Sequence, residues 1–179
     1  MMIIYSLSHI KILKLIIFNP IFIGTIIFTI IGGILAGFLL NLTLRNMIIF
    51  IIILALIPFI VLILTTSGVS YGIENNYIII KYIRTYKIPI NEVNISLVPY
   101  SKVKPVFREA GVSIPGLLAL GRYKFANGKH GIAIIYKPQE KALLITYDNK
   151  LFVISHPGIE KAYRELLNEI KRYNASTRP

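Results

Sequence analysis

Side chains that could act as nucleophiles, bases or metal ligands are few and dispersed along this chain. Cysteine is absent, which excludes disulfides, thiolate metal sites and thiol catalysis. The histidines His9, His130 and His156 lack the spacing of metal ligands, and the single aspartate is Asp148. The sequence therefore predicts neither a metal site nor a cofactor.

One adjacent pair, Ser155-His156, imitates a nucleophile with its base. Consecutive residues at a strand end point in different directions, and no G-x-S-x-G elbow occurs in the chain. Glu165 and Glu169 are spaced four apart, but basic residues surround them on the polar side of a predicted helix. We therefore predict a protein that is not an enzyme, with a hydrolase as a distant alternative.

A long basic loop is predicted over Pro99 to Gly116, and it is the stronger candidate for a binding surface. It contains Lys102, Lys104 and Arg108, with Phe107 among them. Cations near an anionic leaflet contribute about 1 kcal/mol each. We expect these four side chains to contact anionic headgroups or a protein partner. The alternative is a solvated loop held by its three prolines.

The net charge of +12 raises the question of nucleic acid as a partner. All eight acidic residues and all but three of the 20 basic residues lie from Glu74 onward. The positive charges are scattered, and no RRM, OB or helix-turn-helix signature accompanies them, so nucleic acid is disfavoured. Inositol phosphate is also disfavoured, because the turn Glu74 to Asn76 lacks cations and Lys81 and Arg84 point to opposite strand faces.

The apolar residues are concentrated near the N-terminus. The chain is 55% hydrophobic with a mean hydropathy of +0.66, and Leu15–Leu40 and Met47–Leu64 are uncharged runs of 26 and 18 residues. Each run is long enough to cross about 30 Å of hydrocarbon as a helix. We predict a two-helix transmembrane hairpin over residues 15–64, with a lipid bilayer as partner. A cleaved signal peptide is the alternative for the first run, although its apolar core is longer than such peptides use.

The positive-inside rule gives the expected orientation. Lys11 and Lys14 lie in the N-terminal tail, residues 1–14, whereas the six-residue connection between the runs carries only Arg45. Both termini are therefore expected in the cytoplasm of a multi-pass cell-membrane protein. No ionisable residue lies within either run, which disfavours a transporter.

Small residues follow one side of the first predicted helix. Gly33 and Gly37 form a G-x-x-x-G spacing, and Gly32 and Ala36 form a second one. Such spacings allow close helix approach. We expect these residues to pack inside the hairpin or, as the alternative, to mediate self-association.

The rest of the chain reads as a β-rich domain over residues 68–173, followed by a flexible tail, residues 174–179. Tyr77–Ile88 alternates apolar and polar residues as one strand does. Four further strands are separated by turn residues and predict an antiparallel meander: Leu118–Phe125, His130–Tyr136, Lys141–Tyr147 and Lys150–Ser155. A closing helix has an apolar stripe: Ile159, Tyr163, Leu166, Ile170 and Tyr173.

The stretch Val98 to Ile170 resembles the bacterial pleckstrin-homology-like domain families. The resemblance rests on the order of Arg108-x-x-Gly111, Pro115-Gly116, Gly121-Arg122-Tyr123, Gly128 and Val153-Ile154-Ser155-His156-Pro157. Relative to the family's Ile-Ser-Pro motif, His156 is an insertion. Members often carry two N-terminal membrane helices, and many have no assigned activity. The resemblance implies an α+β fold, in which an antiparallel β-barrel or sandwich is capped by one C-terminal helix.

The combined expectation is an integral membrane protein that displays this domain to the cytoplasm. Its predicted role is a non-enzymatic scaffold or interaction module that binds a protein partner. The alternative is a lipid-responsive sensor or regulatory subunit of a membrane complex.

Overall fold

The structure, a computed structural model, describes residues 3–6, 20–66 and 68–176. The chain divides into two compact units. One unit contains the helices α2 (Pro20–Leu39) and α3 (Leu44–Thr66). The other contains the strands and the helix α4 (Ile159–Ser176).

A tight connection joins α2 to α3. Asn41 takes a left-handed φ of 51°, and the Leu42 amide donates to the Gly37 carbonyl at 3.0 Å, which is a Schellman end of a helix. Gly33 and Gly37 are buried and pack closely against α3. A Cβ added to Gly33 would lie 2.8 Å from the Ile51 side chain, and one added to Gly37 would lie 2.5 Å from the Met47 side chain. A Cβ on Gly32 would meet nothing within 4 Å, and Ala36 is half-buried.

The described helices overlap the predicted spans in sequence but do not qualify as membrane spans. Within the described residues, none of the helices has the length and apolarity needed to cross a membrane. Residues 15–19 of the first predicted span lie outside the described residues, and α3 includes the charged Arg45 in its first turn. The predictions of a transmembrane hairpin and of a multi-pass protein of the cell membrane were therefore wrong.

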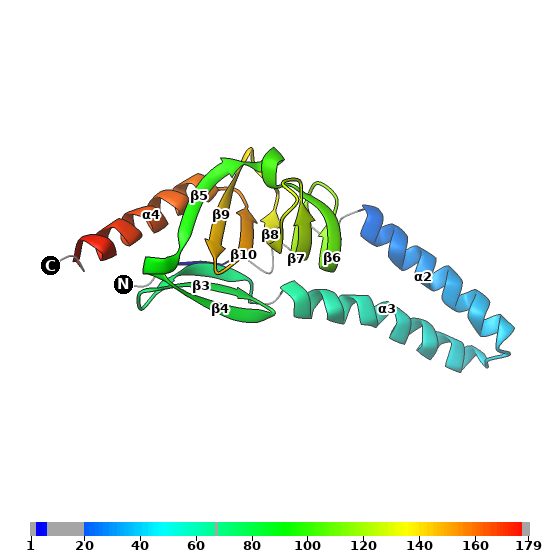
Figure 1. Ribbon diagram of the computed structural model, residues 1–179. Helices are drawn as coiled ribbons and strands as arrows, with labels where there is room; N and C mark the ends of the chain where they lie inside the picture. The colour runs from blue at the N-terminus through cyan, green and yellow to red at the C-terminus, as the bar shows by residue number, and fades with distance from the viewer. Residues whose placement is uncertain (1–2, 7–19, 67, 177–179) are drawn as a thin grey trace. The chain divides into compact units, whose positions relative to one another are not determined.

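The strands of the other unit form two sheets (Figure 1). The first sheet has the order β1-β2-β3-β4, with every neighbouring pair antiparallel. Its strands are β1 (Ile3–Ser6), β2 (Ser70–Glu74), β3 (Tyr77–Tyr82) and β4 (Arg84–Pro89). The strand β1 brings residues close to the N-terminus onto β2, although more than 60 residues separate them in sequence.

The predicted single strand Tyr77–Ile88 is instead a hairpin. Its turn is the single residue Ile83, with a φ of 23°, so that Tyr82 pairs with Arg84. A β-branched residue rarely adopts a positive φ, and no glycine, asparagine or proline marks the turn in the sequence. Ile78 pairs with Ile88, and paired residues share one face of the sheet. Ile78, Ile80 and Ile88 therefore lie on the same face, and all three are buried.

The second sheet has the order β5-β9-β10-β8-β7-β6. Its strands are β5 (Asn94–Pro99), β6 (Pro105–Ile114), β7 (Leu118–Phe125), β8 (His130–Tyr136), β9 (Lys141–Tyr147) and β10 (Lys150–Ser155). Two short 3-10 turns flank β5: η1 (Ile90–Glu92) and η2 (Tyr100–Val103). The four strands predicted from β7 to β10 form with the expected bounds.

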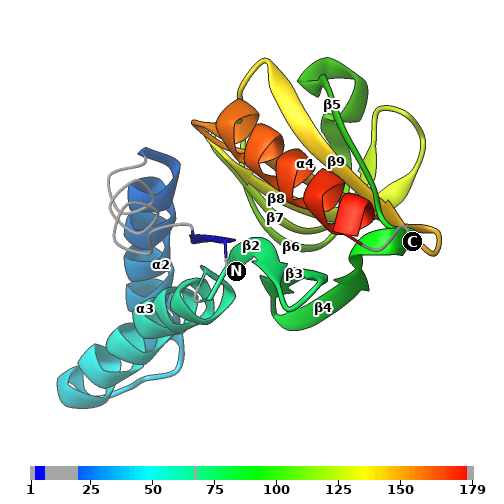
Figure 2. The same cartoon turned by 90° about the vertical axis from the view of Figure 1, so that its left-hand side faces the viewer.

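The predicted meander and the antiparallel barrel were wrong. The strand β10 lies between β9 and β8, and it runs parallel to β8. Because β10 lies between two strands, it forms backbone hydrogen bonds on both of its sides. In a meander, β10 would have been an edge strand with hydrogen bonds on one side only. The fold is a sheet-rich α+β fold with a C-terminal helix, and α4 lies against β9 and β5 (Figure 2).

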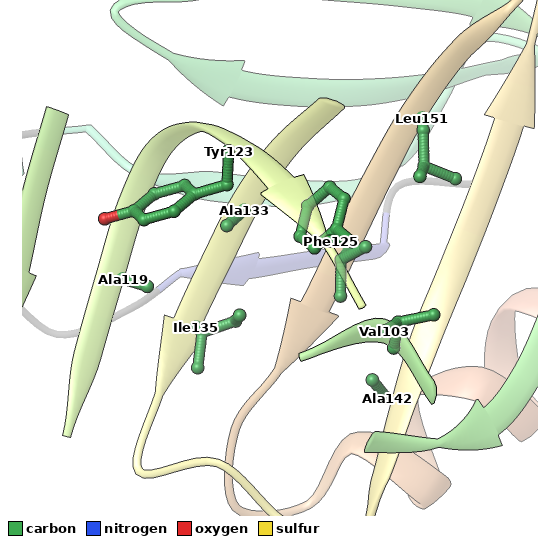
Figure 3. Close-up of a cluster of buried hydrophobic side chains, with 9 residues drawn as sticks. Val103, Ala119, Tyr123, Phe125, Ala133, Ile135, Ala142 and Leu151 are labelled. Carbon is green, nitrogen blue, oxygen red and sulfur yellow. The ribbon is translucent and has the colours of Figure 1, made fainter. Parts of the chain in front are cut away.

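Both faces of β10 are buried. Leu151 and Val153 join a cluster on one side of the sheet, together with Tyr123, Phe125 and the η2 residue Val103 (Figure 3). On the other side, Phe152 packs edge-on against Tyr86 of the first sheet, with ring centroids 5.1 Å apart. The second sheet therefore has an apolar core on each side.

The two-sided core predicts a sharp contrast between two phenylalanines. Phe152 is 1% exposed and Phe107 is 64% exposed. We expect Phe152→Ala to lower the free energy of unfolding by about 3–5 kcal/mol, and Phe107→Ala to change it by less than about 0.5 kcal/mol. Urea unfolding of both variants measures the difference, and equal losses would contradict the assigned core.

Candidate functional site

The basic stretch that was expected to be a loop is largely a strand. Residues 100–103 form η2, and residues 105–114 form β6, which is the edge of the second sheet. Pairing of β6 with β7 supplies the backbone hydrogen bonds that a loop of this length would otherwise lack.

Buried anchors position the two predicted lysines. Between them, Val103 is 3% exposed and lies in the core cluster, while the Tyr100 amide donates to the Glu140 carbonyl at 2.8 Å. The Lys104 carbonyl accepts from the Ala126 amide at 2.9 Å. Lys102 and Lys104 are therefore exposed side chains on a fixed backbone.

Phe107 and Arg108 lie on opposite faces of the sheet edge. Phe107 pairs in register with Lys124, an exposed residue. Arg108 pairs with Tyr123, whose ring lies in the core. Burial raises the pKa of the Tyr123 hydroxyl, and a hydrogen bond with Ser113 and the charge of Arg108 oppose that increase. The four predicted contact residues thus follow one edge without sharing one face.

Two bulges leave residues of β6 without a partner on β7. The register shifts between Pro105 and Phe107 and again between Arg108 and Ala110. The first shift leaves Val106 without a pairing residue on β7, and Val106 is 61% exposed. The second frees Glu109, whose carboxylate pairs with His130 and lies 3.7 Å from Arg122 Nε.

We refer to Lys102, Lys104, Val106, Phe107 and Arg108 as the β6 patch. Its chemistry is two large exposed apolar side chains with three cations. Val106 was not predicted as a contact residue; it adjoins Phe107 in sequence and lies at the first register shift. Such a surface can hold a segment that carries apolar and acidic groups.

The pair Ser155-His156 is divided between different partners. The buried Ser155 Oγ accepts from the Gln139 amide at 3.0 Å and donates to the Lys141 carbonyl at 3.2 Å. His156 lies 2.8 Å through Nδ1 from the Pro157 carbonyl and 2.5 Å through Nε2 from the Tyr71 hydroxyl. A carbonyl only accepts, so Nδ1 carries the proton and Nε2 accepts from Tyr71. Neither side chain activates the other.

The contacts of Tyr71 continue to β1 and α4. Its ring stacks on Tyr5 with centroids 5.2 Å apart, and the Tyr5 hydroxyl donates to the Glu165 carboxylate. Burial is the largest cause that raises the pKa of both tyrosines. These groups hold β1 against the helix, which is a structural role. Over the described part of the chain, no group of three His, Asp or Glu residues could hold a metal ion.

Comparison with known proteins adds no relative. Neither a family model, nor a curated protein, nor a solved structure matches this chain. The resemblance to bacterial pleckstrin-homology-like domains therefore stays a prediction from the motifs quoted above.

The environment of His156 predicts how stability depends on pH. Burial lowers the pKa of His156 in the folded chain, so the unfolded chain binds that proton more tightly. The stabilisation is complete above about pH 6.5 and is lost as the pH falls through the lower pKa of the folded chain. Between about pH 8 and pH 5, urea unfolding should show a larger loss for the native chain than for His156→Gln. Parallel curves would show that His156 does not titrate as its burial implies.

Proposed function

We propose that this protein is a non-enzymatic interaction module that binds a protein partner through the β6 patch. The observation that carries the proposal is the run of six consecutive exposed residues on an edge strand, from Val106 to Gly111. An edge strand presents unpaired backbone groups, and large apolar side chains there favour association unless a partner covers them.

The composition of the β6 patch indicates what the partner must offer. Val106 and Phe107 require an apolar contact, and three cations favour acidic groups around it. The bulges at Val106 and Glu109 interrupt regular strand pairing, so the contact depends on side chains more than on a continuous ladder. The proposal is thus a side-chain interface centred on Phe107.

No described group near the β6 patch supports a catalytic role. Ser155 is buried and engaged in two hydrogen bonds, and His156 lies against Tyr71. Tyr71 and Tyr123 are buried, and burial raises the pKa of each hydroxyl, which favours the neutral form and a packing role. These observations support binding over chemistry.

Site-specific photocrosslinking tests the proposal. A benzophenone amino acid replaces Phe107 in the full chain, within cells of the source organism. The matched control replaces Tyr77, which is 43% exposed on β3 of the other sheet. We expect a discrete protein adduct from position 107 that position 77 does not give. Lys102→Glu/Lys104→Glu should reduce that adduct by about tenfold, because both cations lie in the patch.

Three outcomes would contradict the proposal. The first is no discrete adduct from position 107, and the second is the same adduct from both positions. The third is an adduct with phospholipid in place of protein, which would support the alternative of a lipid-responsive sensor. The unfolding midpoint of each variant serves as the control for folding.

A further inference from the structure

A second feature, separate from the β6 patch, lies where the two sheets meet at the β3–β4 turn. A cavity of about 310 Å³ is lined by side chains of both sheets. Arg84 of β4 and Arg122 of β7 both line it. The two arginines could not be placed together from the sequence, because 37 intervening residues and a change of sheet separate them.

The register shows that both arginines arise from the facing surfaces of the sheets. Tyr82 pairs with Arg84, and the Tyr82 hydroxyl donates to the Leu120 carbonyl of β7 at 3.2 Å. Tyr86, two residues beyond Arg84 and on the same strand face, packs on Phe152 of the second sheet. Arg122 is two residues beyond Leu120 on β7, so it shares the face that Leu120 presents to the core.

The positive charge at this cavity is incompletely neutralised. Across the described residues, no carboxylate forms an ion pair with Arg84. Arg122 approaches Glu109 at 3.7 Å through Nε, and its side chain is 71% exposed. Glu109 is shared with His130. An exposed pair at that distance is weak. The two arginines that line the cavity therefore face one carboxylate, Glu109, that is shared with His130.

Two glycines allow β6 and β7 to approach closely beside the cavity. Gly111 and Gly121 pair in register and approach so closely that a Cβ on either would lie 2.1 Å from a carbonyl oxygen of the other strand. Both residues line the cavity. Ile83 also lines it and is 73% exposed at the turn. The cavity thus combines two arginines with apolar lining residues.

We propose that this cavity binds a phosphomonoester, with Arg84 and Arg122 holding its phosphate. Guanidinium groups bind phosphate oxygens through paired, charge-assisted hydrogen bonds, and a dianion matches two such groups better than a monoanionic carboxylate does. A volume of about 310 Å³ accommodates a small phosphorylated group. The phosphate could belong to a soluble molecule or to a lipid headgroup, since the same two arginines would recognise either.

The cavity is a different site from the turn at which inositol-phosphate binding was disfavoured above. That turn, Glu74 to Asn76, lies at the start of β3, whereas Ile83 and Arg84 follow its end. It also differs from the β6 patch, whose side chains do not line the cavity. Phosphate binding in the cavity can therefore be disproved while protein binding by the β6 patch holds, and protein binding can be disproved while phosphate binding holds.

Isothermal titration of the full chain in nonionic detergent tests the proposal. The probes are glycerol 3-phosphate, short-chain dihexanoyl phosphatidic acid, glycerol and acetate. We expect saturable binding of at least one phosphomonoester with a Kd at or below about 1 mM, and none of glycerol or acetate in that range. Arg84→Gln and Arg122→Gln should each weaken the binding by about tenfold or more. The matched control Arg164→Gln removes one exposed charge on α4 and should leave the Kd unchanged.

The two phosphorylated probes separate the sources of the phosphate. Binding of phosphatidic acid more than about tenfold tighter than glycerol 3-phosphate supports a lipid headgroup, and similar affinities support a soluble ligand. The proposal is overturned if neither probe binds saturably. It is also overturned if both arginine variants bind like the native chain, or if Arg164→Gln loses as much affinity as they do. Thermal unfolding of each variant confirms that the chain is folded.

Discussion

Burial of β10 on both faces is the constraint on which the rest of the β unit depends. Five consecutive residues, from Leu151 to Ser155, are buried. Side chains on one face complete the cluster around Val103, and Phe152 on the other face contacts the first sheet. A strand can be buried in this way only if ladders on both sides satisfy its backbone groups, and β8 and β9 supply those ladders.

The central place of β10 determines where surfaces for binding remain. With β9, β10 and β8 in the middle, β6 becomes an edge, and its bulges expose Val106. The packing of Phe152 on Tyr86 also draws the first sheet over the second, so that Arg84 and Arg122 line one cavity. Both candidate sites thus lie at margins of the same core. Neither needs a catalytic group, which agrees with the buried and engaged state of Ser155.

Local patterns in the sequence predicted elements well and their arrangement poorly. Strands with clear alternation and turn residues, such as His130–Tyr136, were found with their bounds, because period and turn chemistry are local. The turn at Ile83 carries no turn residue, so one strand was predicted where two form.

The parallel pairing of β10 with β8 and the addition of β1 to β2 depend on long-range register, which periodicity does not encode. Uncharged runs suggested membrane spans, but a charge-free run in sequence does not ensure a helix with the length and apolarity to cross a membrane, and α3 includes Arg45 in its first turn. Phe107 and Arg108 were identified as exposed by composition, whereas the arginine cavity needed the tertiary structure.

The most direct test of this account is amide hydrogen exchange of the full chain, compared between β10 and β6. An interior strand with two ladders and two buried faces should open only with the whole domain, whereas an edge strand exposes amides on its free side. We expect the amides of Phe152 to Ser155 to exchange slowest, and those of Val106 to Gly111 to exchange faster by orders of magnitude. If the amides of β6 were as protected as those of β10, its edge would be covered in the isolated chain, and the open binding edge would be contradicted.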